Sequence, residues 1–461
     1  MGGKRQKIQL ELAFMAEMRG EAPSPASEGT EPSVAACAPE SPAAGELLME
    51  EVCERENLIQ AFKRVKANKG SPGVDGMTVG ELGDYLTEHW PSIREHLLNG
   101  TYIPQPVRRV VIPKPGGGER KLGIPTVLDR FIQQAVLQVL QRRWDGTFSE
   151  HSYGFRPGRS AHQAVAQAQR YLAEGRRFVV DLDLERFFDR VNHDILMSRV
   201  AERETDKRML KLIRAYLRAG VMENGLVGPT DEGAPQGGPL SPLLSNLVLD
   251  VLDRELERRG HRFVRYADDS NIYVKSERAG QRVMASVTAF LATKLKLKVN
   301  EAKSAVARPQ ARKFLGFSFT GGTEPRRRIA PPARERFKER VRELTGRSRG
   351  VSLRRMIKEL GQYLNGWRSY FGFCQTPKVL RDLDSWIRRR LRCAVWEQWK
   401  RGPKRFKELR KRGVRDDLAA CTAFSPHGPW RLSHSPGVNA ALPNAYFRSL
   451  GLPSLAACQG A

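Results

Sequence analysis

Hydrophobic and polar positions follow three successive patterns along the chain. Residues 20–46 contain almost no large apolar side chains and are dominated by Ala, Pro, Ser, Glu and Gly. Residues 1–46 are therefore expected to form a disordered, low-complexity extension. From about residue 100 to 320, short apolar runs alternate with longer stretches of helical period. Beyond residue 331 the apolar spacing is helical throughout, so the chain is predicted to contain a mixed domain and then an all-helical one.

The mixed domain is placed at residues 47–320, and its elements are read from the apolar period. Strands are predicted at 107–113, 177–184, 304–308 and 314–319, together with a hairpin at 263–274. Helices are predicted over about 47–69, 129–143, 160–173, 243–256 and 279–295. Strands interleaved with helices in this way indicate an α/β or α+β fold.

The helical domain is placed at residues 325–415. Two apolar stripes at helical spacing predict long helices there: Leu360, Tyr363, Leu364, Trp367 and Phe371, then Leu383, Trp386, Ile387, Leu391 and Val395. Between 385 and 415 there are thirteen Lys or Arg residues against only Glu397 and Glu408. Residues 416–461 cannot be assigned from the pattern and are expected to form a C-terminal basic tail.

Composition narrows the classes of partner. The 461 residues carry a formal net charge of +27, and the first 54 contain ten glutamates but only four basic side chains, so the positive charge belongs to the folded part. A polyanionic partner is implied, and nucleic acid fits better than a membrane surface. Six scattered cysteines without metal-ligand spacing indicate free thiols in a reducing compartment. No long apolar run or signal peptide is present, which predicts a cytoplasmic protein.

The hairpin at 263–274 carries the most informative chemistry. Two apolar runs flank a turn that presents Asp268 and Asp269 side by side. Adjacent carboxylates repel each other unless a cation lies between them. A solvated turn would be the ordinary interpretation of an isolated pair. A second acidic strand upstream changes this, because carboxylates from separate segments can hold two Mg²⁺ ions for phosphoryl transfer.

That second strand covers residues 177–184. Its period of two places Asp181 and Asp183 on one face and apolar side chains on the other. An apolar strand that ends in acids is a suitable place for an active site. Either aspartate could serve by this argument.

Several blocks, in the same order and at plausible spacing, resemble the palm of reverse transcriptases. They are Tyr-Ala-Asp-Asp at 266–269, Asp-Leu-x-x-Phe-Phe-Asp ending at 189, and the Pro-Gln-Gly segment at 233–242. Three further stretches are similar to the group II intron-encoded reverse transcriptase/maturase family in particular: residues 69–75, 124–133 and 363–367. The resemblance as a whole covers roughly residues 50–455. This resemblance implies an α+β right-hand polymerase domain of fingers and palm, followed by an all-helical basic thumb or maturase domain.

The resemblance implies the roles of the acids. Asp183 matches the first metal-binding aspartate, and Asp268 and Asp269 match the other two, which leaves Asp181 as a structural neighbour. The three carboxylates would bind two Mg²⁺ ions, with Mn²⁺ as an alternative.

The same resemblance implies a pocket for a deoxynucleoside triphosphate. Lys114 and Arg120, on either side of a Gly-rich loop, match residues that hold the triphosphate. Phe188 matches the aromatic gate that excludes a 2′-hydroxyl, and Gln236 lies in the turn that resembles the floor of the pocket. Lys303 matches a candidate general acid for pyrophosphate. The glycines beside Gln236 are expected to allow close backbone approach to a ligand.

For the helical domain, the resemblance implies contact with intron RNA and with the template–primer duplex. Aromatic residues and arginines alternate there, and Arg388, Arg389, Arg390 and Arg392 are expected to contact RNA phosphates. Residues 416–461 are a candidate DNA-binding region. The cysteine pairs of the C-terminal HNH nuclease found in some relatives are missing, so no metal-dependent endonuclease is expected.

The leading hypothesis is an RNA-directed DNA polymerase that binds its group II intron RNA, assists splicing and copies the intron for mobility. The expected partners are intron RNA, a DNA target and primer, and deoxynucleoside triphosphates, in a bacterial cytoplasm with nucleoid association on DNA. A reverse transcriptase without an intron, retron-like or defence-associated, is one rival. A non-catalytic RNA-binding splicing factor is another. The intron recognised and the oligomeric state are open.

Overall fold

The computed structural model describes residues 47–113, 119–223, 226–228, 232–233, 237–347 and 349–456. These residues form two compact units. The first unit comprises the residues up to 164 and 179–306, and the second comprises 165–178 and the residues from 307 onward. This division differs at its edges from the predicted boundary near 320.

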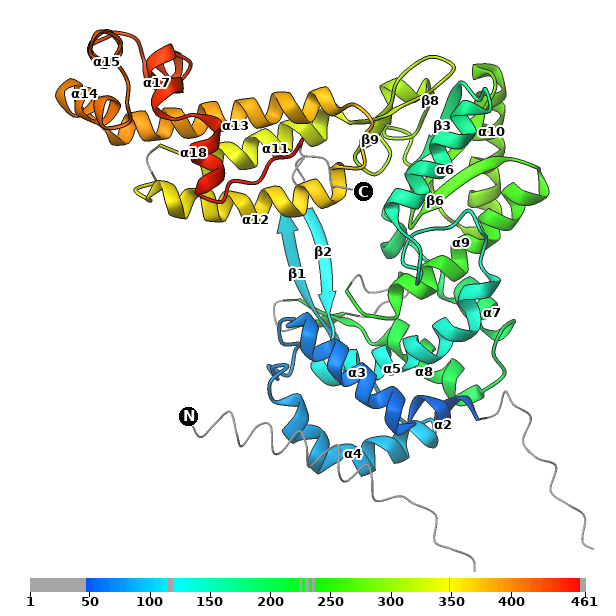
Figure 1. The fold of residues 1–461 in the computed structure, drawn as a ribbon. Coiled ribbons are helices and arrows are strands. Elements are labelled where there is room, and N and C mark those ends of the chain that lie inside the picture. The colour runs from blue at the N-terminus through cyan, green and yellow to red at the C-terminus, as the bar shows by residue number, and fades with distance from the viewer. Residues whose placement is uncertain are drawn as a thin grey trace, which may run out of the picture. The chain divides into compact units, whose positions relative to one another are not determined.

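Helices make up much of the first unit, shown in blue to green in Figure 1. Polar caps fix several of their starts: Thr126, Asn192, Asp206 and Ser276 each accept hydrogen bonds from backbone N–H groups of the following turn. The helices are α2 (Leu48–Val52), α3 (Arg55–Asn68), α4 (Leu82–Leu98), α5 (Val127–Trp144), α7 (His193–Ala201), α8 (Lys207–Arg218), α9 (Ser241–Arg258) and α10 (Glu277–Phe290).

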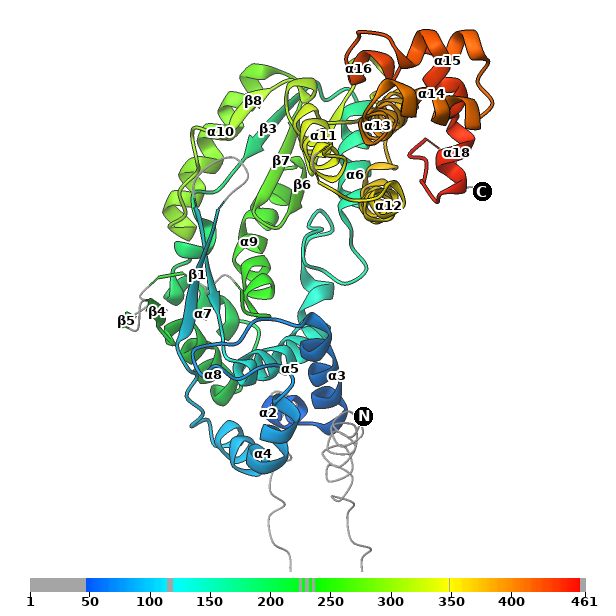
Figure 2. The same cartoon turned by 90° about the vertical axis from the view of Figure 1, so that its left-hand side faces the viewer.

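One sheet of the first unit has the strand order β2-β1-β4-β5. Its strands are β1 (Val107–Pro113), β2 (Glu119–Ile124), β4 (Val221–Glu223) and β5 (Leu226–Gly228). Strands β1 and β2 are antiparallel, with Ile112 opposite Arg120, while β4 runs parallel to β1. Strands β1, β4 and β5 of this sheet are labelled in Figure 2.

A second sheet has the order β6-β7-β3-β8 and carries the predicted acids. Its strands are β3 (Phe178–Leu182), β6 (Arg262–Tyr266), β7 (Asp269–Val274) and β8 (Ala305–Ala307). Helix α9 contacts β6 and helix α10 contacts β7. Phe263 and Val264 point to opposite faces of β6, and both are 0% exposed, so the hairpin is buried on both faces.

The second unit is mostly helical and has its own core. Helix α6 (Ala161–Ala173) begins in the first unit and continues into the second, which also contains the strands β9 (Phe317–Phe319) and β10 (Arg327–Ile329). Both predicted apolar stripes line the core, with Leu360, Leu364, Ile387 and Leu391 almost fully buried. The other helices are α11 (Pro331–Leu344), α12 (Leu353–Phe371), α13 (Pro377–Gln398), α14 (Gly402–Lys411), α15 (Asp416–Ala423), α16 (Pro429–Leu432), α17 (Pro436–Ala441) and α18 (Asn444–Ser449).

The segment expected to be a basic tail folds into the second unit as α15–α18. Buried Asp384 of α13 accepts hydrogen bonds from Ser454 Oγ at 2.6 Å and from the backbone nitrogens of Leu455 and Ala456 at 2.9 and 3.2 Å. Phe447 is 0% exposed in the same core. Up to residue 456 the chain therefore continues the helical unit, and residues 457–461 lie outside the described part.

Several elements differ from the predictions. The helix expected over 47–69 is two helices, α2 and α3, separated at Cys53 and Glu54. Helix α4 and strands β2, β4 and β5 were not predicted. The signal for α4 was present, since Leu82, Leu86, Trp90, Ile93 and Leu97 recur at helical spacing and are buried. The predicted extension over 1–46 lies outside the described residues. No helix in the described part of the chain is long and apolar enough to cross a membrane.

Candidate active site

The hairpin tip is a two-residue turn made by Ala267 and Asp268. Tyr266 pairs with Asp269 at the end of the β6–β7 ladder, which leaves only those two residues in the loop. Ala267 has φ 58°, a left-handed conformation that is uncommon for a residue with a side chain. A positive φ at the first loop position belongs to the tight turns that match the twist of a hairpin. The predicted hairpin is confirmed, but only Asp268 lies in its turn, whereas Asp269, expected beside it at the tip, begins β7.

Asp183 lies close to Asp268 in space. It follows β3 directly, and β3 is the neighbour of β7 in the sheet. Burial raises the pKa of Asp268, and repulsion from the Asp183 carboxylate raises this pKa further. The positive charges of Arg120 and Lys303 act in the opposite direction. Two of the predicted catalytic acids and two predicted nucleotide-binding cations therefore form one electrostatic cluster.

The backbone of Asp183 is held by the segment that follows α10. Its N–H donates to Ser304 Oγ at 3.0 Å, and its carbonyl accepts from the backbone N–H of Asn300 at 2.8 Å. Lys303 Nζ lies 3.6 Å from Asp183 Oδ1, and the side chains are 63% and 42% exposed, respectively. The structure thus brings Lys303 to the carboxylate cluster, while its role as a general acid stays a prediction.

Carboxylate oxygens are the donors that Mg²⁺ prefers, so the residue types at this edge of the sheet fit that ion. The mutual repulsion of Asp183 and Asp268 also favours a bound cation. Among the described residues, however, no group of three or more His, Cys, Asp or Glu side chains is arranged so that it could hold a metal ion. The three predicted carboxylates, Asp183, Asp268 and Asp269, therefore do not form a metal-binding group in this structure. Asp181 lies on β3, two residues before Asp183, and is half-buried.

The other predicted nucleotide-binding residues are only partly described. Lys114 and Gln236 lie outside the described residues. Arg120 is exposed near the start of β2. Phe188 lies in a single 3₁₀ turn, Phe187–Asp189, and is half-buried, whereas the neighbouring Phe187 is 3% exposed with its ring centroid 5.2 Å away. Of the two aromatic residues, Phe187 has the core role, which leaves Phe188 accessible for the predicted gate.

The glycines around Gln236 have contacts of their own. A Cβ on Gly237 (φ 141°) would lie 2.4 Å from Gly123 O of β2, and one on Gly233 (φ 93°) would lie 2.8 Å from Phe188 O. A side chain on Gly238 would meet Gln133 Oε1 at 2.5 Å. In this structure the atoms close to these glycines belong to the protein, and the expected approach to a ligand stays a prediction.

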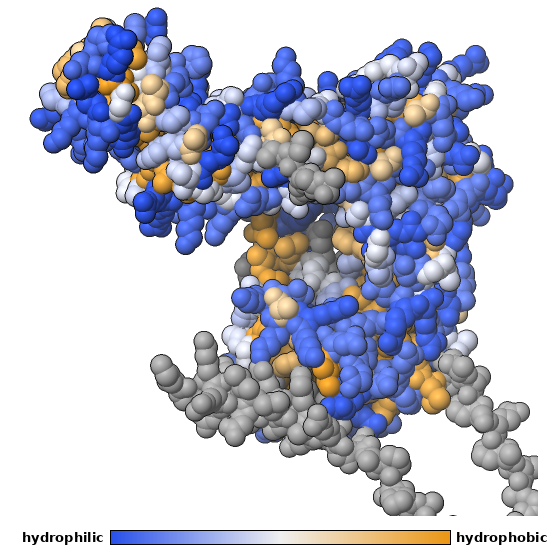
Figure 3. Space-filling view, in the orientation of Figure 1, coloured by the Kyte–Doolittle hydropathy of each residue, from blue (hydrophilic) through white to orange (hydrophobic). Residues whose placement is uncertain are grey.

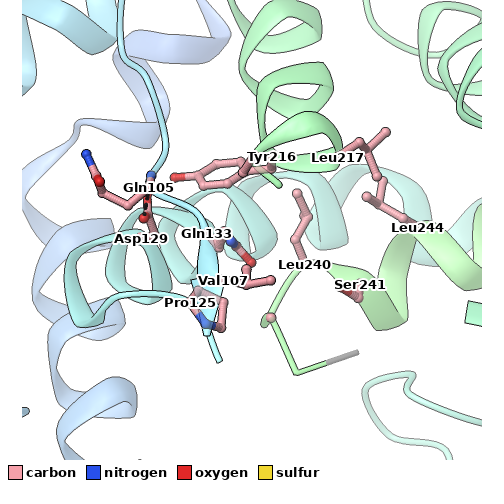
Figure 4. A pocket seen from close by; sticks show the side chains of 12 residues that line it. Gln105, Val107, Pro125, Asp129, Gln133, Tyr216, Leu217, Leu240, Ser241 and Leu244 are labelled. Atoms are coloured by element: carbon pink, nitrogen blue, oxygen red, sulfur yellow. Dashed lines mark hydrogen bonds between the residues drawn. The ribbon is translucent and has the colours of Figure 1, made fainter. Parts of the chain in front are cut away.

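A pocket beside this loop is lined by α5, α8 and the start of α9 (Figure 4). Its buried carboxyl group, Asp129, accepts hydrogen bonds from Thr126 Oγ1 at 2.7 Å, Tyr102 Oη at 2.9 Å and the backbone N–H of Gln105 at 3.2 Å. Burial raises the pKa of Asp129. These bonds tie the segment before β1 to the start of α5, which is a structural role.

The network around Arg265 was missed by the sequence reasoning. Arg265 immediately precedes the Tyr-Ala-Asp-Asp string and is 0% exposed, as is its ion-pair partner Asp253 of α9. A signal was available, because an arginine interrupts an otherwise apolar strand. Its partners come from distant segments, so pattern alone could not identify them.

The arginines predicted to bind RNA lie on α13, in the second unit. Arg392 is 8% exposed, its Nε donates to Leu442 O at 2.9 Å, and its Nη2 donates to Asn444 Oδ1 at 3.0 Å. The guanidinium also lies over the ring of Phe447. This environment contradicts the RNA-binding prediction for Arg392, because its charge is used to attach α17 and α18 to α13.

The other three arginines predicted to bind RNA, Arg388, Arg389 and Arg390, are half-buried. Arg389 lies over the Trp430 ring, 4.1 Å from its centroid, and Arg390 donates to Thr345 Oγ1 at 2.7 Å. The alternating aromatic and arginine residues of this region thus pair partly with one another. RNA contact by Arg388, Arg389 and Arg390 stays a prediction.

More exposed positive charges lie on α14. Lys404, Lys407 and Lys411 are solvent-exposed, and their spacing places them on one helix face. Figure 3 shows hydrophilic side chains over most of the visible face of the second unit.

Two family models match this chain. Reverse transcriptase (RNA-dependent DNA polymerase) covers residues 112–319, and the group II intron maturase-specific domain covers 334–413. Protein YkfC of Escherichia coli K12 is 39% identical over 218 residues, which span 46% of this chain and 57% of YkfC. The group II intron-encoded protein LtrA of Lactococcus lactis is 30% identical over 325 residues, 56% of this chain and 54% of LtrA. The match thus spans somewhat more than half the length of these relatives.

Proposed function

We propose that this chain, which belongs to the group II intron-encoded reverse transcriptase and maturase family, is an RNA-directed DNA polymerase that also binds its intron RNA and assists splicing. The observation that carries the polymerase activity is the carboxylate cluster, in which Asp183 and the Asp268 hairpin tip meet at one edge of a sheet. The two matched domains support the pairing of the activities. The substrates would be deoxynucleoside triphosphates and a primer annealed to RNA.

The chemistry would divide among the residues as follows. Asp183, Asp268 and Asp269 would hold divalent cations, which supply the charge that activates a primer 3′-hydroxyl and stabilises the leaving pyrophosphate. Arg120 and Lys303 add positive charge beside the carboxylates, where the triphosphate of the incoming nucleotide would lie. Ser304 keeps the Asp183 backbone in place.

The maturase activity is assigned to the second unit. Its exposed lysines suit a folded polyanion, and the match to the maturase-specific domain covers most of α11–α14. That domain favours an intron-associated protein over a retron-like one. The intact carboxylates argue against a splicing factor without catalysis.

Primer extension tests the polymerase proposal directly. The purified protein is expected to extend a DNA primer on an RNA template when Mg²⁺ is present and to stop when EDTA is added, because the proposed chemistry needs the cation. Excess Mg²⁺ after EDTA should restore synthesis. A protein that splices its intron but makes no cDNA under any of these conditions would support the splicing-factor alternative.

Sugar discrimination tests the gate. Phe188→Ala is expected to raise the use of ribonucleotides relative to deoxynucleotides by about 10- to 100-fold, because the ring that would clash with a 2′-hydroxyl is removed. Single-nucleotide incorporation with each sugar measures the ratio. Phe187→Ala is the matched control, and it should lower the unfolding free energy by about 3–5 kcal/mol without changing the ratio. An unchanged ratio in the Phe188 variant would remove this residue from the pocket.

A further inference from the structure

The guanidinium of Arg265 is fully buried and uses all five of its N–H groups. Nε and one N–H of Nη2 bond the Asp253 carboxylate, with Nη2 to Oδ2 at 2.6 Å. The second N–H of Nη2 donates to Ser152 Oγ at 2.8 Å. Nη1 donates to Asn246 Oδ1 and to Ala267 O, both at 2.9 Å. The last of these acceptors belongs to the left-handed residue of the hairpin turn.

Residues 152–154, which precede α6, also contact the strand end and the turn. Ser152 pairs with Arg265, and the backbone N–H of Tyr153 donates to Arg265 O at 2.9 Å. A Cβ on Gly154 would lie only 2.2 Å from the backbone nitrogen of Ala267. Asn246 Nδ2 donates to Gly154 O at 2.9 Å, so one α9 side chain holds both this glycine and the guanidinium.

We propose that Arg265 is a positioning residue for the hairpin turn, and that its bond to Ala267 O sets where the Asp268 and Asp269 carboxylates lie. A left-handed alanine is not a conformation that the local sequence favours, so surrounding structure must impose it. The planar fork of arginine suits this task because it bonds a carboxylate and two further acceptors in fixed directions. Asp253 is the counter-ion that allows the charge to be buried. This inference rests on the proposed polymerase activity.

Two variants test the arginine while keeping the fold. Arg265→Lys keeps a positive charge beside Asp253, but its ammonium has three donors where the guanidinium has five. The double variant Arg265→Met with Asp253→Leu removes both charges, which avoids an unpaired buried carboxylate. Gly154→Ala leaves the Arg265–Asp253 ion pair intact, but its Cβ would clash with the backbone nitrogen of Ala267 and displace the turn. Each variant is expected to lower kcat by about 10- to 100-fold, the scale of a misplaced catalytic group. The KM for primer–template should stay within about twofold, because the exposed lysines proposed to bind RNA lie in the second unit.

Arg203→Met is the matched control for stability. Arg203 Nη2 donates to Asp250 Oδ2 at 3.2 Å, so it too forms an ion pair with α9 but does not reach the hairpin. This variant should lower Tm while keeping the parental kcat and the parental Mg²⁺ dependence. The Arg265 and Gly154 variants should instead require a higher Mg²⁺ concentration for half-maximal rate.

Hydrogen exchange gives a readout that needs no activity. Peptides covering 263–272 should exchange faster in the Arg265 and Gly154 variants and at the parental rate in Arg203→Met. Parental kcat in any folded Arg265 variant, or unchanged exchange of these peptides, would overturn the inference. Exchange that rises equally throughout the first unit would also overturn it, as a general loss of stability. If the parental protein makes no cDNA, the proposed function fails, and the exchange comparison alone then decides the role of Arg265.

Discussion

Replacing Asp268 and Asp269 together with alanine is expected to abolish Mg²⁺-dependent cDNA synthesis, with a loss of at least about 10³-fold. Both hairpin carboxylates would be removed, and metal ions supply several kcal/mol of transition-state stabilisation, with each 1.36 kcal/mol equal to tenfold in rate. Primer extension on an RNA template measures the effect. Intron RNA binding and assisted splicing should survive, because the exposed lysines proposed to bind RNA lie in the second unit.

Two aspartates, Asp181 on β3 and Asp183 directly after it, provide a matched pair of controls for this experiment. Asp183→Ala should be as damaging as the hairpin variant, since its carboxylate interacts with Asp268. Asp181→Ala should keep most of the activity, because Asp181 is assigned as a neighbour. Residual synthesis in the hairpin variant would show that the metal site is misassigned. Inactivity of Asp181→Ala would show that the first carboxylate was chosen wrongly.

Neutralising the exposed basic face of α14 is expected to separate splicing from polymerisation. The variant changes Lys404, Lys407 and Lys411 of α14 to Gln, together with Arg401→Gln at the residue directly before the helix. All four side chains are solvent-exposed, so it removes four exposed charges. The slope of log affinity for intron RNA against log salt should become shallower by about 3, since each phosphate contact contributes about 0.7–0.9. Assisted splicing at physiological salt should fall by about tenfold or more. Primer extension on a short primer–template in excess should persist.

Arg392→Gln is the informative control in this case. It also removes one positive charge, but from a buried guanidinium that holds Leu442 and Asn444, so it should lower Tm. For this reason, a variant in which Arg388, Arg389, Arg390 and Arg392 are all neutralised would not separate the two effects. Weaker RNA binding by that variant could come from unfolding or from lost RNA contacts. Normal splicing by the α14 variant at physiological salt would mean that this face is not the RNA-binding surface.

The candidate site was predictable from sequence wherever the signal is local. Two apolar runs around a turn predict a hairpin, and a period of two predicts a strand, so the hairpin with Asp268 in its turn and the strand before Asp183 were both found. Helical apolar stripes likewise fixed the core faces of α12 and α13. Family resemblance then placed the separate blocks in one active site, which local pattern could not do.

Charge and glycine were less informative, because their roles depend on what lies nearby. Thirteen basic residues between 385 and 415 indicated a polyanion partner. Only the fold shows that Arg392 is enclosed while Lys404 is exposed. The glycines of the Pro-Gln-Gly loop suggested contact with a ligand, yet the groups that exclude a side chain there include Gly123 O and Phe188 O.

The sequence by itself therefore determined the mixed domain followed by a helical one, the acidic hairpin, the basic helical region and the family. Only the tertiary structure decided which basic side chains are exposed, such as Lys404, and which are buried and hold helices together, such as Arg392. It also revealed that Arg265 joins Asp253, Asn246, Ser152 and Ala267, a set that spans 115 residues of chain between Ser152 and Ala267. The physical reason is that strand and helix periods arise from neighbouring residues. The cost of burying a charge or a polar group is met by partners that are adjacent only after the chain has folded.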